Sequence, residues 1–224
     1  MASFILLLLF YLSLIAQFPP YQTVASGPID PTEGFRSLPL NQSNFVIQKP
    51  YDIPLDQRYK FSNGVRKLWV YSTDKPYSSH SKSKPRTEIR IQGYDYSTGV
   101  WQFEGYVYVP HGTSGVSIMQ VFIGSGQQKG ASAVMLKVYN GSLYYNRNHA
   151  QLVPYIYDRW FRLNVIHDVV ASKVQVFIDG VLKYDERRRE AGVCRYYFQC
   201  GVYAQDHESH YMESCWKDIK ILKK

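Results

Sequence analysis

The chain has few cysteines and no stretch with the periodicity of an amphipathic helix. Three cysteines among 224 residues exclude a small domain held together by many disulfides. Beyond residue 27 no window repeats apolar residues at helical spacing, and Tyr, Val, Thr, Gly and Phe outweigh Ala, Leu and Glu. That composition disfavours a helical bundle or a coiled coil. Because 45% of the residues are apolar, the chain can bury a core, which argues against disorder.

Acidic residues are also in the minority. The chain carries 26 Lys and Arg against 18 Asp and Glu, a formal net charge of +8 at pH 7. Such an excess favours polyanionic partners but does not say which anion.

No side chain that is charged at neutral pH precedes Asp30, and residues 4–16 form an unbroken apolar or neutral run. The run is shorter than the roughly 20 residues of a spanning helix and is closed by Gln17 and Pro19-Pro20. Small residues follow at 24–26, so we predict a cleaved signal peptide over 1–26, with a signal anchor as the alternative. The prediction implies a secretory protein without a stable membrane span after cleavage, and it makes nucleic acid an improbable partner.

Two sequons agree with secretion, and they predict glycosylation at Asn41 and Asn140. Cys194 and Cys200 form a disulfide in one interpretation, which leaves Cys215 free. In the other, all three are unpaired and mostly buried thiols. The sequence does not decide between the two.

Almost every signal after the leader is β. Residues 27–55 are Pro-rich and irregular, typical of an N-terminal arm, whereas 56–224 contain repeated alternation of apolar and polar residues. Asp179-Gly180 and Asn140-Gly141 each separate two such runs, as hairpin turns do. Because no change in composition divides the chain, we predict one antiparallel β-sandwich, a jelly roll with a concave groove, over 56–224.

Three of the predicted strands carry unusually polar outer faces. Since alternate residues of a strand share a face, each set projects together. The residues are Arg86, Glu88, Arg90 and Gln92 on the first strand, Gln120 on the second, and Tyr197, Gln199, Tyr203 and Gln205 on the third. A solvated outer face with ordinary charge pairing explains the first set alone. Together, guanidinium, amide and phenol groups suit an acidic sugar, because arginine binds a carboxylate through two parallel hydrogen bonds.

These strands also carry a family resemblance. The segments Arg-Thr-Glu-Ile-Arg (86–90), Gln-Val-Phe (120–122) and Tyr-Phe-Gln-Cys-Gly-Val-Tyr-Ala-Gln (197–205) resemble the three signature strands of alginate-lyase and glucuronan-lyase jelly rolls. Over most of its length, including 68–76 and 157–165, the chain more closely resembles the plant citrate-binding proteins of the same fold family. That resemblance implies a vacuolar location, and the predicted signal peptide leaves an extracellular or cell-wall location as the alternative.

Polyuronate lyases of this fold cleave by β-elimination without a metal or cofactor. By position, Arg86 and Gln120 resemble the pair that neutralises the uronate carboxylate, Arg90 a substrate contact, and Tyr203 the catalytic phenol. Two motif positions depart from the alginate-lyase pattern, since Phe122 replaces the usual histidine and Gln199 the usual lysine. In glucuronan lyases an upstream histidine takes the base role, and His80 is a candidate here, with an ordinary exposed loop histidine as the alternative.

The sequence therefore favours a monomeric secretory protein that binds carboxylates, either citrate or the uronates of an acidic polysaccharide. The alternative is an active lyase that cleaves a glucuronan-like polymer. One further cluster is a weaker candidate. His207-Glu208-Ser209-His210 lacks a recognised zinc spacing, so we expect no metal site.

Overall fold

The structure, a computed structural model, describes residues 28–126, 129–145, 150–187 and 194–224. The strands of one sheet, sheet A, are β1 (Arg36–Leu38), β3 (Tyr59–Ser62), β4 (Val65–Tyr71), β6 (Val100–Tyr108), β11 (Trp160–Asp168), β12 (Lys173–Ile178), β13 (Val181–Arg187) and β15 (Tyr211–Lys223). The strands of the other, sheet B, are β2 (Phe45–Gln48), β5 (Arg86–Ile91), β7 (Val116–Ser125), β8 (Ser132–Tyr139), β9 (Ser142–Tyr145), β10 (Ala150–Val153) and β14 (Arg195–Ala204).

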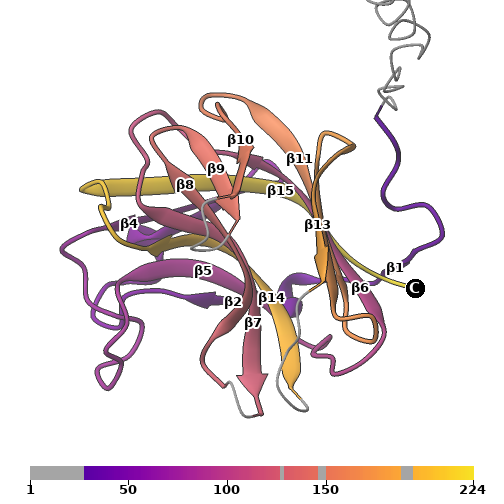
Figure 1. Cartoon of the computed structure of the whole chain (residues 1–224). Coiled ribbons are helices and arrows are strands. Elements are labelled where there is room, and N and C mark those ends of the chain that lie inside the picture. The colour runs from indigo at the N-terminus through magenta and orange to yellow at the C-terminus, as the bar shows by residue number, and fades with distance from the viewer. Residues whose placement is uncertain (1–27, 127–128, 146–149, 188–193) are drawn as a thin grey trace, which may run out of the picture.

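The two antiparallel sheets pack face to face, which confirms the predicted β-sandwich (Figure 1). Sheet A has the order β13-β12-β11-β6-β15-β4-β3, with β1 beside β15, and sheet B has the order β10-β9-β8-β7-β14-β5-β2. Both predicted hairpin turns are confirmed, because Asp179-Gly180 joins β12 to β13 and Asn140-Gly141 joins β8 to β9. In the part of the chain that the structure describes, no helix has the length and apolarity needed to cross a bilayer.

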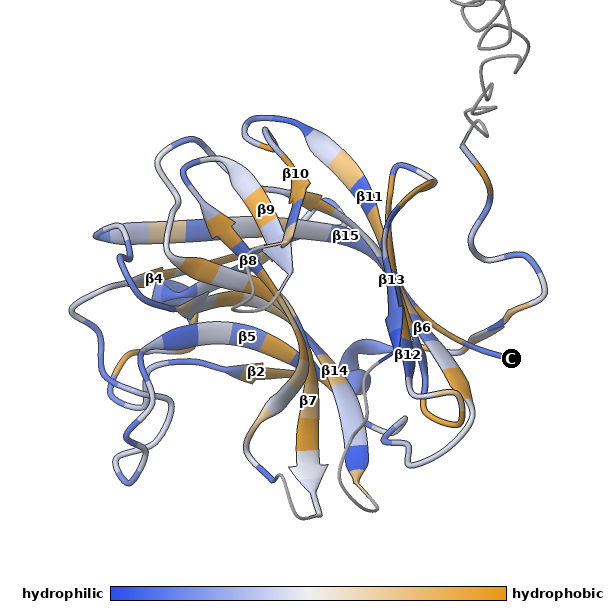
Figure 2. Cartoon of the chain, in the orientation of Figure 1, coloured by the Kyte–Doolittle hydropathy of each residue, from blue (hydrophilic) through white to orange (hydrophobic). Residues whose placement is uncertain are grey.

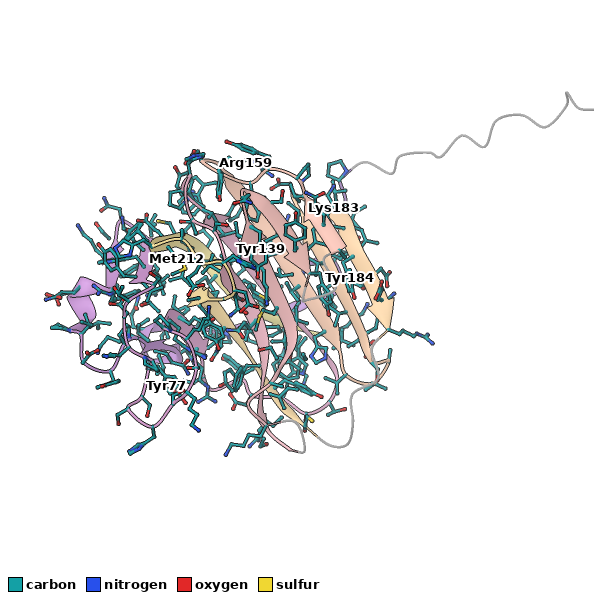
Figure 3. The ribbon with its side chains drawn as sticks, turned by 60° about the vertical axis from the view of Figure 1, so that its left-hand side comes forward. Tyr77, Tyr139, Arg159, Lys183, Tyr184 and Met212 are labelled. Atoms are coloured by element: carbon teal, nitrogen blue, oxygen red, sulfur yellow. The ribbon has the colours of Figure 1, made fainter. Side chains whose placement is uncertain are left out.

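Alternation along the strands builds the core, as Figure 2 shows for β5. Phe198 of β14 packs against Phe103 of β6, and Phe103 packs in turn against Trp216 of β15, with ring centroids 5.9 and 5.6 Å apart. All three rings are almost completely buried. Tyr184 of β13, the edge strand of sheet A that Figure 3 labels, stacks at 3.8 Å on Tyr145 of β9, which is second from the edge of sheet B.

The N-terminal arm contains two strands, whereas the sequence predicts an irregular chain there. Residues 45–48 form β2, which extends sheet B beside β5, and 36–38 form β1. Two short 3-10 turns, Gln42–Asn44 and Leu55–Gln57, lie in the same segment. The Arg66 guanidinium lies 4.0 Å from the Phe45 ring and donates to Gln42 Oε1, so it ties this segment to sheet A. The predicted signal peptide lies outside the described residues.

One glycine allows two neighbouring strands of sheet B, β14 and β5, to approach each other closely. Gly201 of β14 lies opposite Glu88 of β5 and has φ +142°, and a Cβ there would lie 2.4 Å from the Thr87 carbonyl oxygen. Its own carbonyl accepts from Ser214 Oγ of sheet A at 2.8 Å, and Trp216 Nε1 donates to the same hydroxyl at 3.0 Å. Gly201 therefore sets both the approach of β5 to β14 and a link between the sheets.

We predict that Gly201→Ala lowers the free energy of unfolding by about 2–3 kcal/mol, because the added methyl overlaps backbone that cannot move aside. Urea denaturation measures the change. Gly112→Ala is the matched control, since Gly112 also has positive φ, +87°, but no atom lies within 4 Å of its Cβ position. Equal losses for the two variants would show that the close approach at Gly201 contributes nothing.

Candidate functional site

The three polar strands of the sequence lie side by side in sheet B, in the order β7-β14-β5. Gln199 of β14 lies opposite Arg90 on one side and Gln120 on the other, and Tyr203 lies opposite Arg86. Residues opposite one another in a sheet project from the same face. We call this face the polar face, made of Arg86, Glu88, Arg90, Gln120, Tyr197, Gln199 and Tyr203.

A buried carboxylate lies at the centre of the polar face. The Glu88 side chain is completely buried and accepts hydrogen bonds from Arg86 Nη1 at 3.3 Å, from Gln199 Nε2 at 3.3 Å and from Gln120 Nε2. Ser132 Oγ donates to Gln120 Oε1 at 2.6 Å, which orients that amide toward Glu88. Burial raises the pKa of the Glu88 carboxyl, and the Arg86 charge and the Gln120 hydrogen bond oppose the rise.

Arg86 is held by this carboxylate and by aromatic rings. Its Cζ lies 3.8 Å from the centroid of the Tyr203 ring and 5.2 Å from that of Tyr77, on the loop between β4 and β5 (Figure 3). Arg86 is 5% exposed, and its Nε has no hydrogen-bond partner among the described residues. The guanidinium is thus fixed in position, and one of its donors is buried without a partner among the described residues.

A second stack occupies the other end of the face. Arg90 lies 4.2 Å from the centroid of the Tyr197 ring, and the Phe122 ring lies 5.2 Å from Tyr197 on the neighbouring strand. Burial raises the pKa of Tyr197 to about 12, so its phenol stays protonated at neutral pH. Phe122 occupies the position where the alginate-lyase motif has histidine, and it provides packing there instead of an imidazole.

Two of the predicted site residues are not brought into this network. His80 is exposed in a turn, with its backbone nitrogen 3.3 Å from Ser78 Oγ, and among described residues no hydrogen bond or ring contact joins it to Arg86 or Tyr203. Gln205 turns back on its own strand, where Nε2 donates to the Ala204 carbonyl at 2.9 Å. Gln92 lies just beyond the end of β5, and the other seven predicted residues form the polar face. An open hollow meets that face at Arg90, and a groove across all three strands stays a prediction.

Sequence reasoning missed three contributors to the site. Tyr77 contacts Arg86 from a loop, and Ser132 orients Gln120 from β8. Lys137, also on β8, lies opposite Ser117, which lies opposite Tyr203, so Lys137 shares the polar face and is 4% exposed. Alternation in 134–138 places Lys137 outward, but nothing in the sequence says that β8 lies next to β7.

The cysteines and sequons have defined places in the fold. The structure contains no Cys194–Cys200 bridge, and Cys200 and Cys215 are free thiols. Cys194 and Cys200 lie along one extended segment, about 20 Å apart at six residues, well beyond disulfide reach. Asn41 and Asn140 are both exposed, the first capping a 3-10 turn and the second in the β8–β9 turn.

Residues 207–210 have structural contacts of their own. The Glu208 carboxylate pairs with Lys84 Nζ at 2.9 Å, and the His210 Nδ1 lies 3.4 Å from Ser72 Oγ. Within the described ranges, no three His, Cys, Asp or Glu side chains are grouped so as to hold a metal ion.

Similarity to known proteins agrees with this geometry. Residues 38–223 match the family model described as alginate lyase. The chain belongs to that family. It is also 53% identical over 195 residues to a citrate-binding protein from Hevea brasiliensis, a match that covers 87% of this chain and 79% of the relative.

Solved structures of the family share the fold at low identity. The alginate lyase AlgAT5 of polysaccharide lyase family 7 superposes with a TM-score of 0.65 at 15% identity, over 80% of this chain and 93% of its own. The alginate lyase AlyA1 from Zobellia galactanivorans superposes with a TM-score of 0.61 at 16% identity, over 75% and 81%. These likenesses support the jelly-roll assignment and say nothing by themselves about activity.

Proposed function

We propose that the polar face binds carboxylates, either citrate or the uronates of an acidic polysaccharide. The observation that carries the proposal is Arg86, whose guanidinium is anchored by buried Glu88, covered by the Tyr203 ring and left with an unpartnered Nε. A relative that is 53% identical is a citrate-binding protein, which supports a carboxylate ligand.

The chemistry of the face suits an acidic sugar or a small organic acid. A guanidinium presents its donors in a fixed fork that matches a carboxylate, and its position is already determined before the ligand arrives. Tyr203 is partly exposed and offers a flat surface beside Arg86. Because Glu88 lies completely below the surface, its negative charge orients Arg86 without meeting the ligand.

Arg86→Gln should weaken binding of citrate or of glucuronate oligomers by about 10- to 100-fold, since one charge-assisted contact is lost. Isothermal titration calorimetry measures the dissociation constants of both variants and of wild type. Arg159→Gln is the matched control, because the Arg159 side chain is 40% exposed and pairs with Asp179 on sheet A. No heat above the buffer control at millimolar concentrations of any of these acids would refute the proposal.

The second candidate function is β-elimination of a glucuronan-like polyuronate. It is favoured by Arg86, Gln120 and Tyr203 lying on one face, since Arg86 and Gln120 would neutralise the uronate carboxylate while a base removes the neighbouring C5 proton. Breaking the glycosidic C–O bond then leaves a C4–C5 double bond and a protonated leaving oxygen. Tyr203 is the candidate acid or base on the face, and His80 the candidate on the β4–β5 loop.

An active lyase would raise the ultraviolet absorbance of a polyglucuronate solution, because each cleavage creates an unsaturated uronate. Tyr203→Phe should then reduce the rate at least 100-fold, the scale of a lost proton-transfer group. No absorbance gain with wild type on a panel of polyuronates, or an equal rate in Tyr203→Phe, would contradict this second function.

The proposed setting is the secretory pathway, with the vacuole or the cell wall as destination, and the proposed state is a monomer. A glycan at Asn140 would lie at the β8–β9 turn, and a glycan at Asn41 would lie in the turn before β2, beside the hollow that meets the polar face at Arg90.

A further inference from the structure

Aromatic side chains gather on the outward face of sheet A, on the other side of the sandwich from the polar face. Trp160 of β11 lies opposite Tyr108 of β6, and Tyr106 projects from the same face two residues away on β6. Trp160 and Tyr106 are each 36% exposed, and the Trp160 and Tyr108 ring centroids are 5.7 Å apart. Lys217 of β15 lies opposite Tyr106. We call these four residues the aromatic cluster.

The aromatic cluster is held in place by the turn before β11. The Tyr108 hydroxyl donates to Asp158 Oδ1 at 3.0 Å, and the His111 backbone nitrogen donates to the same oxygen at 3.0 Å. These bonds fix the Tyr108 ring, against which Trp160 packs. Aromatic rings that are exposed and already positioned lose little conformational entropy when a ligand packs on them.

Lys217 is the charged member of the aromatic cluster. Its Nζ lies 4.5 Å from the centroid of the Trp160 ring and 5.8 Å from that of Tyr106. Among the described residues it has no acidic partner, whereas Glu213, an acid on the same face of β15, already pairs with Lys67 at 2.6 Å. The cluster therefore combines exposed rings with an unpaired ammonium, which favours a ligand that has both a flat apolar surface and a negative charge.

We infer that the outward face of sheet A is a second glycan-binding surface, and that its ligand is an anionic polysaccharide. One side of a sugar ring consists of C–H groups that pack on an exposed aromatic ring, while a carboxylate of the sugar pairs with Lys217. The row Trp160, Tyr108, Cys215 and Lys67 crosses the four strands from β11 to β4, so it extends about 14 Å. That length suits several linked sugars. The inference does not rest on the proposed function, because the polar face belongs to the other sheet.

The position of the rings favours a polymer over a lipid surface. Trp160, Tyr106 and Tyr108 all lie on strands within a sheet. Aromatic side chains that anchor a protein to a membrane must instead reach about 5–10 Å into the boundary between headgroups and acyl chains.

The test measures binding to immobilised polyglucuronate and to its methyl ester by biolayer interferometry. Every protein tested carries Arg86→Gln, so that the polar face contributes little. Trp160→Ala should weaken binding to both polymers about tenfold, because a stacking ring is lost, whereas Trp160→Phe should retain most of the affinity. Lys217→Gln should weaken binding to polyglucuronate about threefold and leave binding to the methyl ester unchanged, since only the acid offers a charge to the ammonium.

Lys183→Gln is the matched control for the loss of one positive charge. Lys183 is exposed on β13, four strands away from β15 in sheet A, so its replacement should leave both affinities unchanged. Thermal unfolding checks that each variant is folded.

Three outcomes would overturn the inference. In the first, Trp160→Ala binds both polymers as tightly as its Arg86→Gln parent. In the second, Lys217→Gln and Lys183→Gln lose equal affinity. In the third, the parent binds neither polymer but binds vesicles of anionic phospholipid through Trp160, which would assign the surface to a membrane. If Arg86→Gln alone abolishes binding to both polymers, this inference fails although the proposed function stands.

Discussion

The carboxylate of Glu88 is the constraint on which the polar face depends. It is completely buried, and three donors from three strands converge on it, namely Arg86, Gln120 and Gln199. A buried charge of this kind is tolerated only when it is fully paired, so each donor is held where the carboxylate needs it. Gly201 makes the arrangement possible, because β14 passes too close to Glu88 for any side chain. The position of Arg86 over Tyr203 then follows from the fold.

Much of the fold could be predicted from the sequence, because the alternation of apolar and polar residues is local. It identified β5, β7 and β14 and the faces of their side chains, and the Asp-Gly and Asn-Gly pairs located two hairpins. The contacts that create the site are not local, since Gln199 and Glu88 are 111 positions apart. Their adjacency was expected from the unusually polar faces of the three strands, and the family resemblance supported it.

The failures of sequence reasoning have physical causes. The β2 strand is four residues long and gains its order from pairing with β5 and from Arg66, so its own pattern is too short to indicate a strand. Gln205 follows the alternation of β14, but the strand ends at Ala204 and its amide bonds to the backbone. Lys137 reaches the polar face only because β8 lies next to β7, a neighbour that spacing does not reveal.

The most direct test of the account is the oligouronate affinity of Glu88→Gln, measured by calorimetry beside wild type. Coulomb's law alone predicts tighter binding, because the substitution removes a negative charge next to an anion site. If Glu88 instead holds Arg86, Gln120 and Gln199 in place, the affinity should fall about tenfold, since the amide offers one acceptor oxygen to three donors. An unchanged or increased affinity, in a variant whose thermal unfolding shows that it is folded, would contradict the account.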